Sequence, residues 1–309
     1  MSLIAKKIIK NEFYMNKKEK EFSLEFIKLR RIIVSRQIDM QCYKNAEKVK
    51  QIELLDRAFH YGDGCFTTAR VCNGVIELES LHIARLHLGC ERLLLSADLS
   101  YIQQTIELFK QDHVNLNGTM KIVVSRGEGQ RGYSLPTHPA DVWVFFYPQA
   151  SEALTYSEID SGVLQHAIGL NMPQMVGVKS LNRLEQVLLK HEAEQHGWLE
   201  ALVTDVQGSV VEGVSSNCFI LLNDRWISPE LRYNGVHGVM RAEILARMQQ
   251  QGMSCELRMI DMEEIPRFQS LFFCNALSPM KIAKSLNHQH LDVQPCIDLF
   301  HRLQLNQMQ

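Results

Sequence analysis

Short runs of β-forming residues alternate with segments of helical periodicity through most of the chain, and this alternation constrains the fold most. Residues 120–124 and 141–147 are rich in β-branched and aromatic side chains, which favour strands. A Cys-Asn-Gly turn at 72–74 joins two further strand-like runs, as in a β-hairpin. Apolar residues in 83–97 recur at the spacing of an amphipathic helix, with Ser80 as its predicted N-cap. We therefore predict strands with helices on one face, an α+β fold.

The chain of 309 residues, 46% of them hydrophobic, is long enough for about two domains with separate cores. The pattern turns polar and small around Pro148 to Glu158, where we place a domain boundary. We expect an N-terminal extension over 1–39, a small domain over 40–150 and a larger domain over 151–309. In the larger domain the predicted strands are 162–168, 210–214 and 218–222, the predicted helices are 181–196 and 239–251, and a hairpin turn falls at 205–208.

The charge balance argues against nucleic-acid and membrane-surface roles. The 33 Lys and Arg and 35 Asp and Glu leave a formal charge of -2, so no global positive field exists to hold a polyanion. The apolar runs are far shorter than the roughly twenty residues that a membrane-spanning helix needs. The eight cysteines include no C-x-x-C pair or zinc-like spacing, so we expect reduced thiols, no metal site and a cytoplasmic location.

Residues 1–39 differ in charge from the rest of the chain. They hold ten Lys or Arg and five Asp or Glu, which gives this segment a charge of +5. Its scattered apolar residues suit a short amphipathic helix but not a core. We expect a solvated extension, with Met40 as an alternative start; a helix that binds a membrane or a partner is the other interpretation.

Lys179 is a candidate nucleophile. It follows the apolar residues 176–178 and precedes a predicted helix, so its ammonium group is expected to be partly desolvated. Desolvation lowers the pKa of a lysine and makes its amine a nucleophile and a base near neutral pH. Position alone also fits an ordinary solvated lysine at the start of a helix.

Glu212 lies in an apolar, strand-like run, Val210 to Phe219. A carboxylate buried there needs a cation or a hydrogen-bond donor. A protonated pyridine nitrogen would serve, because a carboxylate beside it keeps the ring cationic. The pattern alone equally allows Glu212 to point outward from an exposed face of the sheet.

Arg85 and the turn at 235–238, Gly-Val-His-Gly, form a candidate phosphate site. Free N–H groups at a helix start favour an anion, and a guanidinium adds charge. Arg85 could also form an ordinary ion pair on a helix surface. The chain has no P-loop or dinucleotide fingerprint, no G-x-S-x-G elbow and no H-E-x-x-H motif, which argues against a nucleotide site, a serine hydrolase and a zinc protease.

Seven motifs follow one another along the chain. They are Y-G-D-G with Thr67 and Thr68, Arg85 in H-I-A-R-L, S-R-G with Arg131-Gly132-Tyr133, Lys179 in G-V-K-S-L-N-R-L-E-Q, Glu212 with Asn217, G-V-H-G-V-M-R, and Asn275-Ala276-Leu277. Taken in order, these motifs resemble those of the fold-type IV pyridoxal-phosphate enzymes, and within that group they are most similar to the aminodeoxychorismate lyases. The resemblance runs from about residue 40 to near the C-terminus, and the joint order of the motifs is more specific than any one of them.

The resemblance implies a two-domain fold with pyridoxal 5'-phosphate at the domain interface, in a homodimer. Lys179 would hold the cofactor aldehyde covalently, and Glu212 would pair with the pyridine nitrogen. Arg85 would hold the phosphate together with the backbone at Val236 and His237. As a separate expectation, Asn275 lies in the loop that closes the phosphate side.

The implied reaction is the conversion of 4-amino-4-deoxychorismate to 4-aminobenzoate and pyruvate in folate biosynthesis. Aminotransferases of this group place Glu after the aromatic residue of the first turn, where this chain has Thr67, and this difference favours a lyase. The substrate carries two carboxylates, for which Arg126 and Arg131 are a candidate clamp; an exposed structural loop is the alternative. Thr67 is a further candidate substrate-binding residue. A branched-chain or D-amino-acid aminotransferase and a non-catalytic cofactor-binding homologue are the competing functions.

Overall fold

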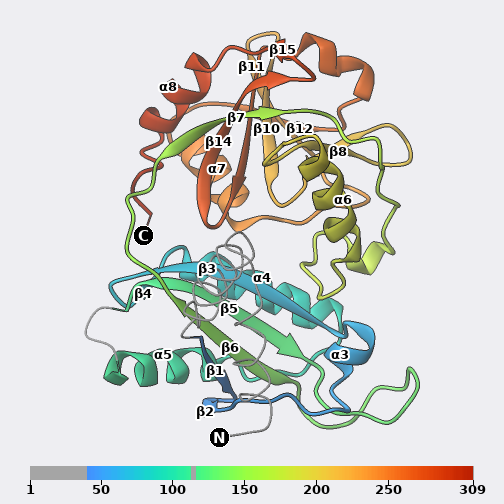
Figure 1. The fold of residues 1–309 in the computed structure, drawn as a ribbon, viewed down its shortest axis with the longest axis vertical. Helices are drawn as coiled ribbons and strands as arrows, with labels where there is room; N and C mark the ends of the chain where they lie inside the picture. Colours follow the sequence, from blue (N-terminus) through green and yellow to red (C-terminus); the bar gives the residue numbers. More distant parts are fainter. Residues whose placement is uncertain (1–39, 113–115, 309) are drawn as a thin grey trace, which may run out of the picture. The chain divides into compact units, whose positions relative to one another are not determined.

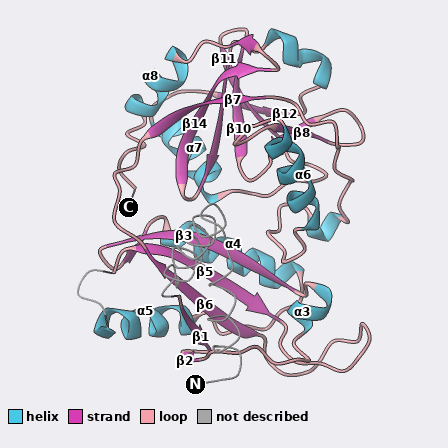
Figure 2. Cartoon of the chain, viewed as in Figure 1, coloured by secondary structure: helices cyan, strands magenta, loops and turns pink. Residues whose placement is uncertain are grey.

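The computed structural model describes residues 40–112 and 116–308, and the chain from Gln41 onward forms one compact unit. The predicted extension over 1–39 lies outside the described residues. Two main β-sheets organise the described part, and helices pack against each (Figures 1 and 2). No helix in it is long and apolar enough to cross a membrane.

The first sheet consists of antiparallel strands in the order β2-β1-β6-β5-β3-β4. The strands are β1 (Gln41–Lys44), β2 (Glu47–Lys48), β3 (Gly64–Cys72), β4 (Val75–Ile76), β5 (Gly118–Ser125) and β6 (Asp141–Pro148). The helices of this part are α3 (Arg57–Tyr61), α4 (Glu79–Arg92) and α5 (Ser100–Asp112). The predicted hairpin, with its turn at 72–74, is confirmed as β3 and β4.

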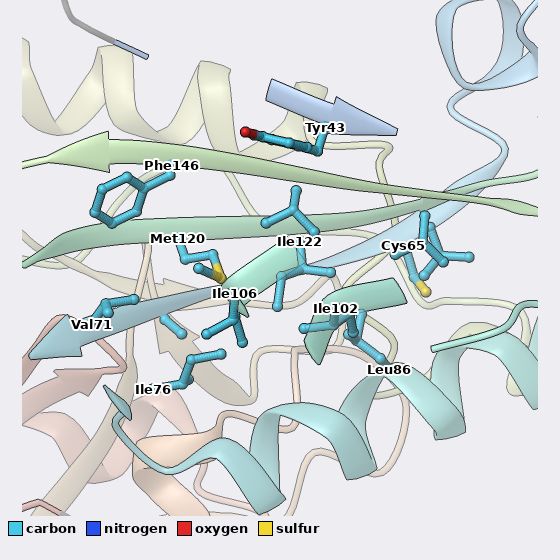
Figure 3. Packing of buried hydrophobic residues seen from close by; sticks show 14 of the residues in the cluster. Tyr43, Cys65, Val71, Ile76, Leu86, Ile102, Ile106, Met120, Ile122 and Phe146 are labelled. Carbon is cyan, nitrogen blue, oxygen red and sulfur yellow. The ribbon is translucent and has the colours of Figure 1, made fainter. Parts of the chain in front are cut away.

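The side chains of β3 alternate between the two faces of this sheet, and the two faces differ in what they contact. Cys65, Ala69 and Val71 are buried on the face that α4 and α5 cover. Figure 3 shows this core, in which Leu86 of α4 and Ile102 of α5 lie among side chains of the strands. The opposite face carries the half-buried side chains of β3, and these are free to line a site.

The second sheet has the strand order β12-β11-β10-β13-β14-β15, and β7 also pairs with β14. Its strands are β7 (Tyr156–Ser161), β10 (Asn217–Leu222), β11 (Arg225–Pro229), β12 (Cys255–Arg258), β13 (Ser270–Asn275), β14 (Ser278–Leu286) and β15 (Gln289–His290). A separate ribbon pairs β8 (Leu202–Thr204) with β9 (Val210–Gly213). The helices are η2 (Pro173–Met175), α6 (Leu184–Gln195), α7 (Val239–Gln250), η3 (Met262–Arg267) and α8 (Gln294–Arg302).

Fully buried aromatic residues anchor the core on one face of this second sheet. Phe272 of β13 stacks on Phe219 of β10 with ring centroids 5.0 Å apart. Ile244 of α7 and Leu299 of α8 belong to the same buried cluster, so these two helices cover this face. The two sheets divide the chain between them, with one set of strands ending at Pro148 and the other starting at Tyr156. The domain bounds themselves stay a prediction.

Two local predictions are wrong, both because tertiary contacts decide them. The segment 162–168 forms isolated bridges, from Val163 to Leu202 and from Ile168 to Asp205, while the strand lies just before it as β7. Ser80 lies inside the first turn of α4 and caps nothing; the N-cap is Leu78, at φ 56°. The other predicted helices and hairpins lie within a few residues of their expected bounds.

Candidate active site

A cavity of about 820 Å³ brings together side chains from both halves of the chain. Phe66 and Thr68 of β3 line it beside Arg85 of α4. Lys179, Glu212 of β9 and residues of α6, of the start of α7 and of the loop after β13 complete its wall. The structure therefore places three of the candidate residues, Lys179, Glu212 and Arg85, around one space.

The backbone on either side of Lys179 is fixed to neighbouring elements. Gly177, at φ 78°, accepts a hydrogen bond from the N–H of His237, and Phe66 donates its N–H to the carbonyl of Lys179 at 2.9 Å. These bonds hold the side chain over Phe66, with Nζ 4.9 Å from the ring centroid. Within residues 40–112 and 116–308, the amine forms no hydrogen bond or ion pair.

Burial makes the Lys179 amine unusually easy to deprotonate. Burial first, and then the guanidinium groups of Arg85 and Arg183, lower the pKa of Lys179 from 10.5 to about 8, against the opposing charge of Glu212. A lysine with a pKa near 8 has a neutral, nucleophilic fraction at physiological pH. This amine can therefore attack an aldehyde and exchange a proton.

Glu212 is a buried carboxylate with an incomplete set of partners. Its Oε2 accepts the backbone N–H of Val236 at 2.9 Å and the side-chain amide of Asn217 at 3.4 Å. Burial raises the pKa of Glu212 to about 7, although the Val236 bond and the charges of Lys179 and Arg183 oppose the rise. A cationic group in the cavity would return this carboxylate to its charged form. The site thus favours a ligand with a protonated ring nitrogen.

Arg85 offers a positive charge that no carboxylate in the described part of the chain pairs with. One guanidinium nitrogen donates to the hydroxyl of Thr67, while the buried Nε has no hydrogen-bond partner among residues 40–112 and 116–308. Burial lowers the pKa of Arg85 to about 10, which leaves it charged at neutral pH. A buried guanidinium with an unused N–H donor suits an anion such as a phosphate.

Thr67 supports Arg85 and is not part of the cavity wall. Its side chain is fully buried, and its hydroxyl lies 2.5 Å from Nδ1 of His82 as well as within hydrogen-bond distance of Arg85. The next residue, Thr68, lines the cavity. In this geometry Thr68, and not Thr67, faces the cavity, and the substrate contact of Thr67 stays a prediction.

The backbone amides predicted to hold a phosphate are already in use. Val236 donates its N–H to Glu212, and His237 donates its N–H to the carbonyl of Gly177 at 3.1 Å. The prediction is corrected by moving the contact to the start of α7. There Gly238 is the N-cap without a capping side chain, and the first N–H groups of a helix have no partner within it.

Gly238 has to be glycine at this place. A Cβ added there would lie 1.9 Å from Oδ1 of Asn217, whose side-chain amide donates to the carbonyl of Val236. The N–H groups of residues 239 and 240 lie in the first turn of α7 and have no partner within the helix, and Gly238 and Val239 line the same cavity as Arg85. Backbone amides at a helix start and a buried guanidinium together make an anion site.

Asn275 shapes the loop that closes the same side. Its side-chain oxygen accepts the N–H groups of Leu277 and Ser278 at 3.0 Å, and its amide donates to the hydroxyl of Ser216 at 3.1 Å. Ser215 and Ser216 line the cavity and donate their hydroxyls to the buried carboxylate of Glu200. Asn275 thus helps to hold the serines in place.

The structure does not bring Arg126 and Arg131 to the cavity. Arg126 forms an ion pair with Asp63 at 2.8 Å and donates to the carbonyls of Leu93 and Leu94. Its guanidinium therefore connects the residue before β3 to the end of α4 in the part of the chain that contains the first sheet. Arg131 is exposed in the loop that follows β5, and neither arginine lines the cavity. The structure therefore gives the predicted clamp no support at this cavity, and the clamp stays a prediction.

Arg183 is a cavity residue that the sequence patterns did not single out. It follows Lys179 by four residues and donates to the carbonyls of Ser180 and Val178 at 2.8 and 3.3 Å. Its charge contributes to the lowered pKa of Lys179. The sequence feature that could have identified Arg183 is its position immediately before α6, the helix that begins close to the candidate lysine.

The donor set matches the chemistry of pyridoxal phosphate. A free amine of lowered pKa suits the aldehyde, a buried carboxylate suits the ring nitrogen, and an unused guanidinium N–H beside open helix amides suits the phosphate. The residues present therefore fit this cofactor.

Comparisons with known proteins point the same way. The family model described as amino-transferase class IV matches residues 64–286. An aminodeoxychorismate lyase of Vibrio harveyi is 30% identical over 232 residues, which cover 73% of this chain and 84% of that protein. A D-alanine aminotransferase of Bacillus licheniformis is 22% identical, over 77% of this chain and 84% of that one.

A solved structure is similar over nearly its whole length. The crystal structure of 4-amino-4-deoxychorismate lyase from Pseudomonas aeruginosa is 30% identical and superposes with a TM-score of 0.73. The match covers 84% of this chain and 98% of that one. The fold is therefore shared along most of the chain.

Proposed function

The chain belongs to the amino-transferase class IV family, the fold-type IV enzymes, and we propose that it is a lyase that uses pyridoxal 5'-phosphate. Its substrate would be 4-amino-4-deoxychorismate, and its products 4-aminobenzoate and pyruvate, in folate biosynthesis. The observation that carries the proposal is the meeting of Lys179, Glu212 and Arg85 around one cavity. The two lyases at 30% identity, and Thr67 where aminotransferases of the group place Glu, support a lyase.

In this proposal each part of the cofactor has a place in the chain. Lys179 would bind the aldehyde, Glu212 the ring nitrogen, and Arg85 with the amides of residues 239 and 240 the phosphate. The loop of Asn275 would close over the phosphate side. When bound, the cofactor supplies an electron sink for negative charge on the carbon that bears the substrate amine.

The chain's own residues then move the proton. Once the substrate amine has replaced it at the cofactor aldehyde, the neutral amine of Lys179 would take the proton from the amine-bearing ring carbon, for which a pKa near 8 is well placed. Glu212 keeps its partner nitrogen protonated. The bond from the neighbouring carbon to the enolpyruvyl oxygen breaks, so that pyruvate leaves and the ring becomes aromatic. A keto acid is not needed as an amino-group acceptor.

Pyruvate release tests this function directly. We expect purified protein loaded with pyridoxal phosphate to release pyruvate and 4-aminobenzoate in equal amounts from aminodeoxychorismate without any keto acid. A branched-chain or D-amino-acid aminotransferase would instead convert an amino acid only when a keto acid is supplied. A non-catalytic homologue would bind the cofactor and turn over neither substrate.

Arg85→Ala should weaken retention of the cofactor roughly tenfold to a hundredfold, the range expected for one charge-assisted contact. Arg85 offers a buried charge beside the open helix amides, and alanine removes it. Equilibrium dialysis against pyridoxal phosphate measures the effect. Arg225→Ala, which removes an exposed arginine of β11, is the control. Equal retention by both variants would place the phosphate elsewhere.

We also propose a cytoplasmic homodimer. All eight cysteines are free thiols, which suits a reducing compartment. One side of α6 leaves Leu184 and Val187 72% and 61% exposed, and Val187 also lines the cavity. A second copy that covers this side would bury it and narrow the cavity. If sedimentation equilibrium shows the mass of a monomer at micromolar protein concentration, that result contradicts the proposed dimer.

A further inference from the structure

His82 of α4 is a buried polar residue close to Arg85 that does not reach the cavity. The two residues are three apart on one helix, so their side chains lie on the same face of it. His82 is 1% exposed and does not line the cavity, whereas Arg85 does. Burial of a polar ring costs free energy unless the ring forms hydrogen bonds, so its partners indicate what the ring does.

Thr67 of β3 connects these two side chains. One guanidinium nitrogen of Arg85 donates to the Thr67 hydroxyl, and the same oxygen lies 2.5 Å from Nδ1 of His82. In the alternation of β3, Thr67 falls between Cys65 and Ala69, on the buried face that α4 covers. A single hydroxyl group therefore contacts both polar side chains of the helix.

The chemistry of the three groups determines the direction of both hydrogen bonds. A guanidinium nitrogen can only donate, so the Thr67 oxygen accepts from Arg85. Among residues 40–112 and 116–308, the hydroxyl hydrogen of Thr67 then has Nδ1 of His82 as its acceptor. Burial, and then the charge of Arg85, lower the pKa of His82 to about 3, so the ring is neutral and carries its one proton on Nε2.

The other nitrogen of the ring shows that His82 does not serve stability. Nε2 is buried and has no hydrogen-bond partner in the part of the chain that the structure describes. An unpaired N–H group costs the folded state free energy, and an apolar side chain of similar size would avoid that cost. The bond at Nδ1, which acts on Thr67 and Arg85, is what histidine contributes here.

This bond bears on how Arg85 meets a ligand. Arg85 forms no other hydrogen bond within the described residues. An arginine loses rotamer freedom when a ligand immobilises it, and one that is already held loses less. We propose that His82 is a positioning residue, which through the Thr67 hydroxyl holds the Arg85 guanidinium in place for the cofactor phosphate; this inference rests on the phosphate contact given in the proposed function.

Binding of the cofactor with and without its phosphate separates positioning from a structural role. In cofactor-free protein, His82→Leu should raise Kd for pyridoxal 5'-phosphate about threefold to tenfold, the effect expected when one side chain is no longer held in advance. Kd for pyridoxal, which lacks the phosphate, should not change. His82→Asn, whose amide oxygen can accept near the place of Nδ1, should recover most of the loss. Absorbance titration measures these constants, and His87→Leu, at an exposed histidine of α4, is the matched control.

Thr67→Val tests the same hydrogen bond from its other end. Valine has the shape of threonine without the hydroxyl. Because His82 is proposed to act only through that hydroxyl, the double variant of His82→Leu and Thr67→Val should bind pyridoxal 5'-phosphate no more weakly than Thr67→Val alone. The double variant also serves if His82→Leu does not fold, since it leaves no Thr67 hydrogen without an acceptor.

Several results would overturn the inference. They are an equal loss of affinity for pyridoxal and its phosphate in His82→Leu, no loss for either, and additive losses in the double variant. A proton on Nδ1 of His82 in wild type, measured by nitrogen NMR of labelled histidines, would also overturn it. If Arg85→Ala weakens cofactor binding and His82→Leu does not, the role of His82 alone is rejected; if neither does, the proposed phosphate contact is rejected as well.

Discussion

Lys179→Ala should abolish turnover, with a fall in kcat of at least about a thousandfold. The variant loses both the group that would hold the cofactor covalently and the base that would take the substrate proton. Folding should be preserved, since the amine makes no hydrogen bond or ion pair to the described chain that alanine would break. The loss would therefore report chemistry and not stability.

Borohydride reduction followed by peptide mapping is the measurement that accompanies this variant. In wild type the label should appear on the peptide that contains Lys179. Lys284→Ala, which removes a half-exposed lysine paired with Asp160, should be labelled and active like wild type. Label on another lysine, or full activity of Lys179→Ala, would refute the covalent role.

The pH dependence of cofactor uptake follows from the environment of the same amine. Burial, and then Arg85 and Arg183, lower the pKa of Lys179 to about 8. Because the neutral amine is the nucleophile, the rate at which cofactor-free protein combines with pyridoxal phosphate should rise with pH and level off above about pH 8. A rate that still rises past pH 10 would indicate an ordinary, solvated lysine.

Features set by neighbouring residues in the sequence were predictable. The hairpin at 72–74 and the helix that begins after Gly238 depend on local turn chemistry and periodicity, and both are present. The segment 162–168 was predicted as a strand, but it pairs with the distant residues 202 and 205 through isolated β-bridges. The strand forms instead in β7, whose partner β14 lies far away in sequence.

The candidate site shows the same limit. The order of the motifs identified Lys179, Glu212 and Arg85, which the fold brings to one cavity. Sequence could not show that the amide of Val236 is taken by Glu212, or that Arg126 is held by Asp63, because both partners are distant in sequence.

Glu212→Gln should reduce turnover about a hundredfold to a thousandfold while the cofactor stays bound, a loss typical of removing one electrostatic group from an active site. In the wild-type chain the N–H of Val236 donates to the Glu212 carboxylate at 2.9 Å. Glutamine keeps an oxygen that can accept this hydrogen bond, so the loop at 235–238 should remain in place. It cannot supply the negative charge that keeps a ring nitrogen protonated. Steady-state pyruvate release and cofactor absorbance measure the two effects separately.

The same variant should make the cofactor-free protein more stable at neutral pH. Burial raises the pKa of Glu212 to about 7 in the folded chain, above its ordinary value of 4.5. The folded state then binds the proton more tightly than the unfolded state. This contribution to stability is therefore complete below pH 4.5 and is lost as the pH rises through 7. Glutamine, which stays neutral, avoids the loss.

Urea unfolding of cofactor-free wild type and Glu212→Gln between pH 4.5 and 8 tests this reasoning. The variant should gain relative to wild type as the pH rises, up to a few kcal/mol. Glu243→Gln, at a carboxylate that pairs with Arg247, is the control and should show no such gain. Parallel stability curves, or unchanged turnover, would mean that Glu212 is an ordinary solvated acid. If Glu212→Gln is more stable but less active than wild type, then the charged Glu212 carboxylate destabilises the folded protein and is present to bind the ligand.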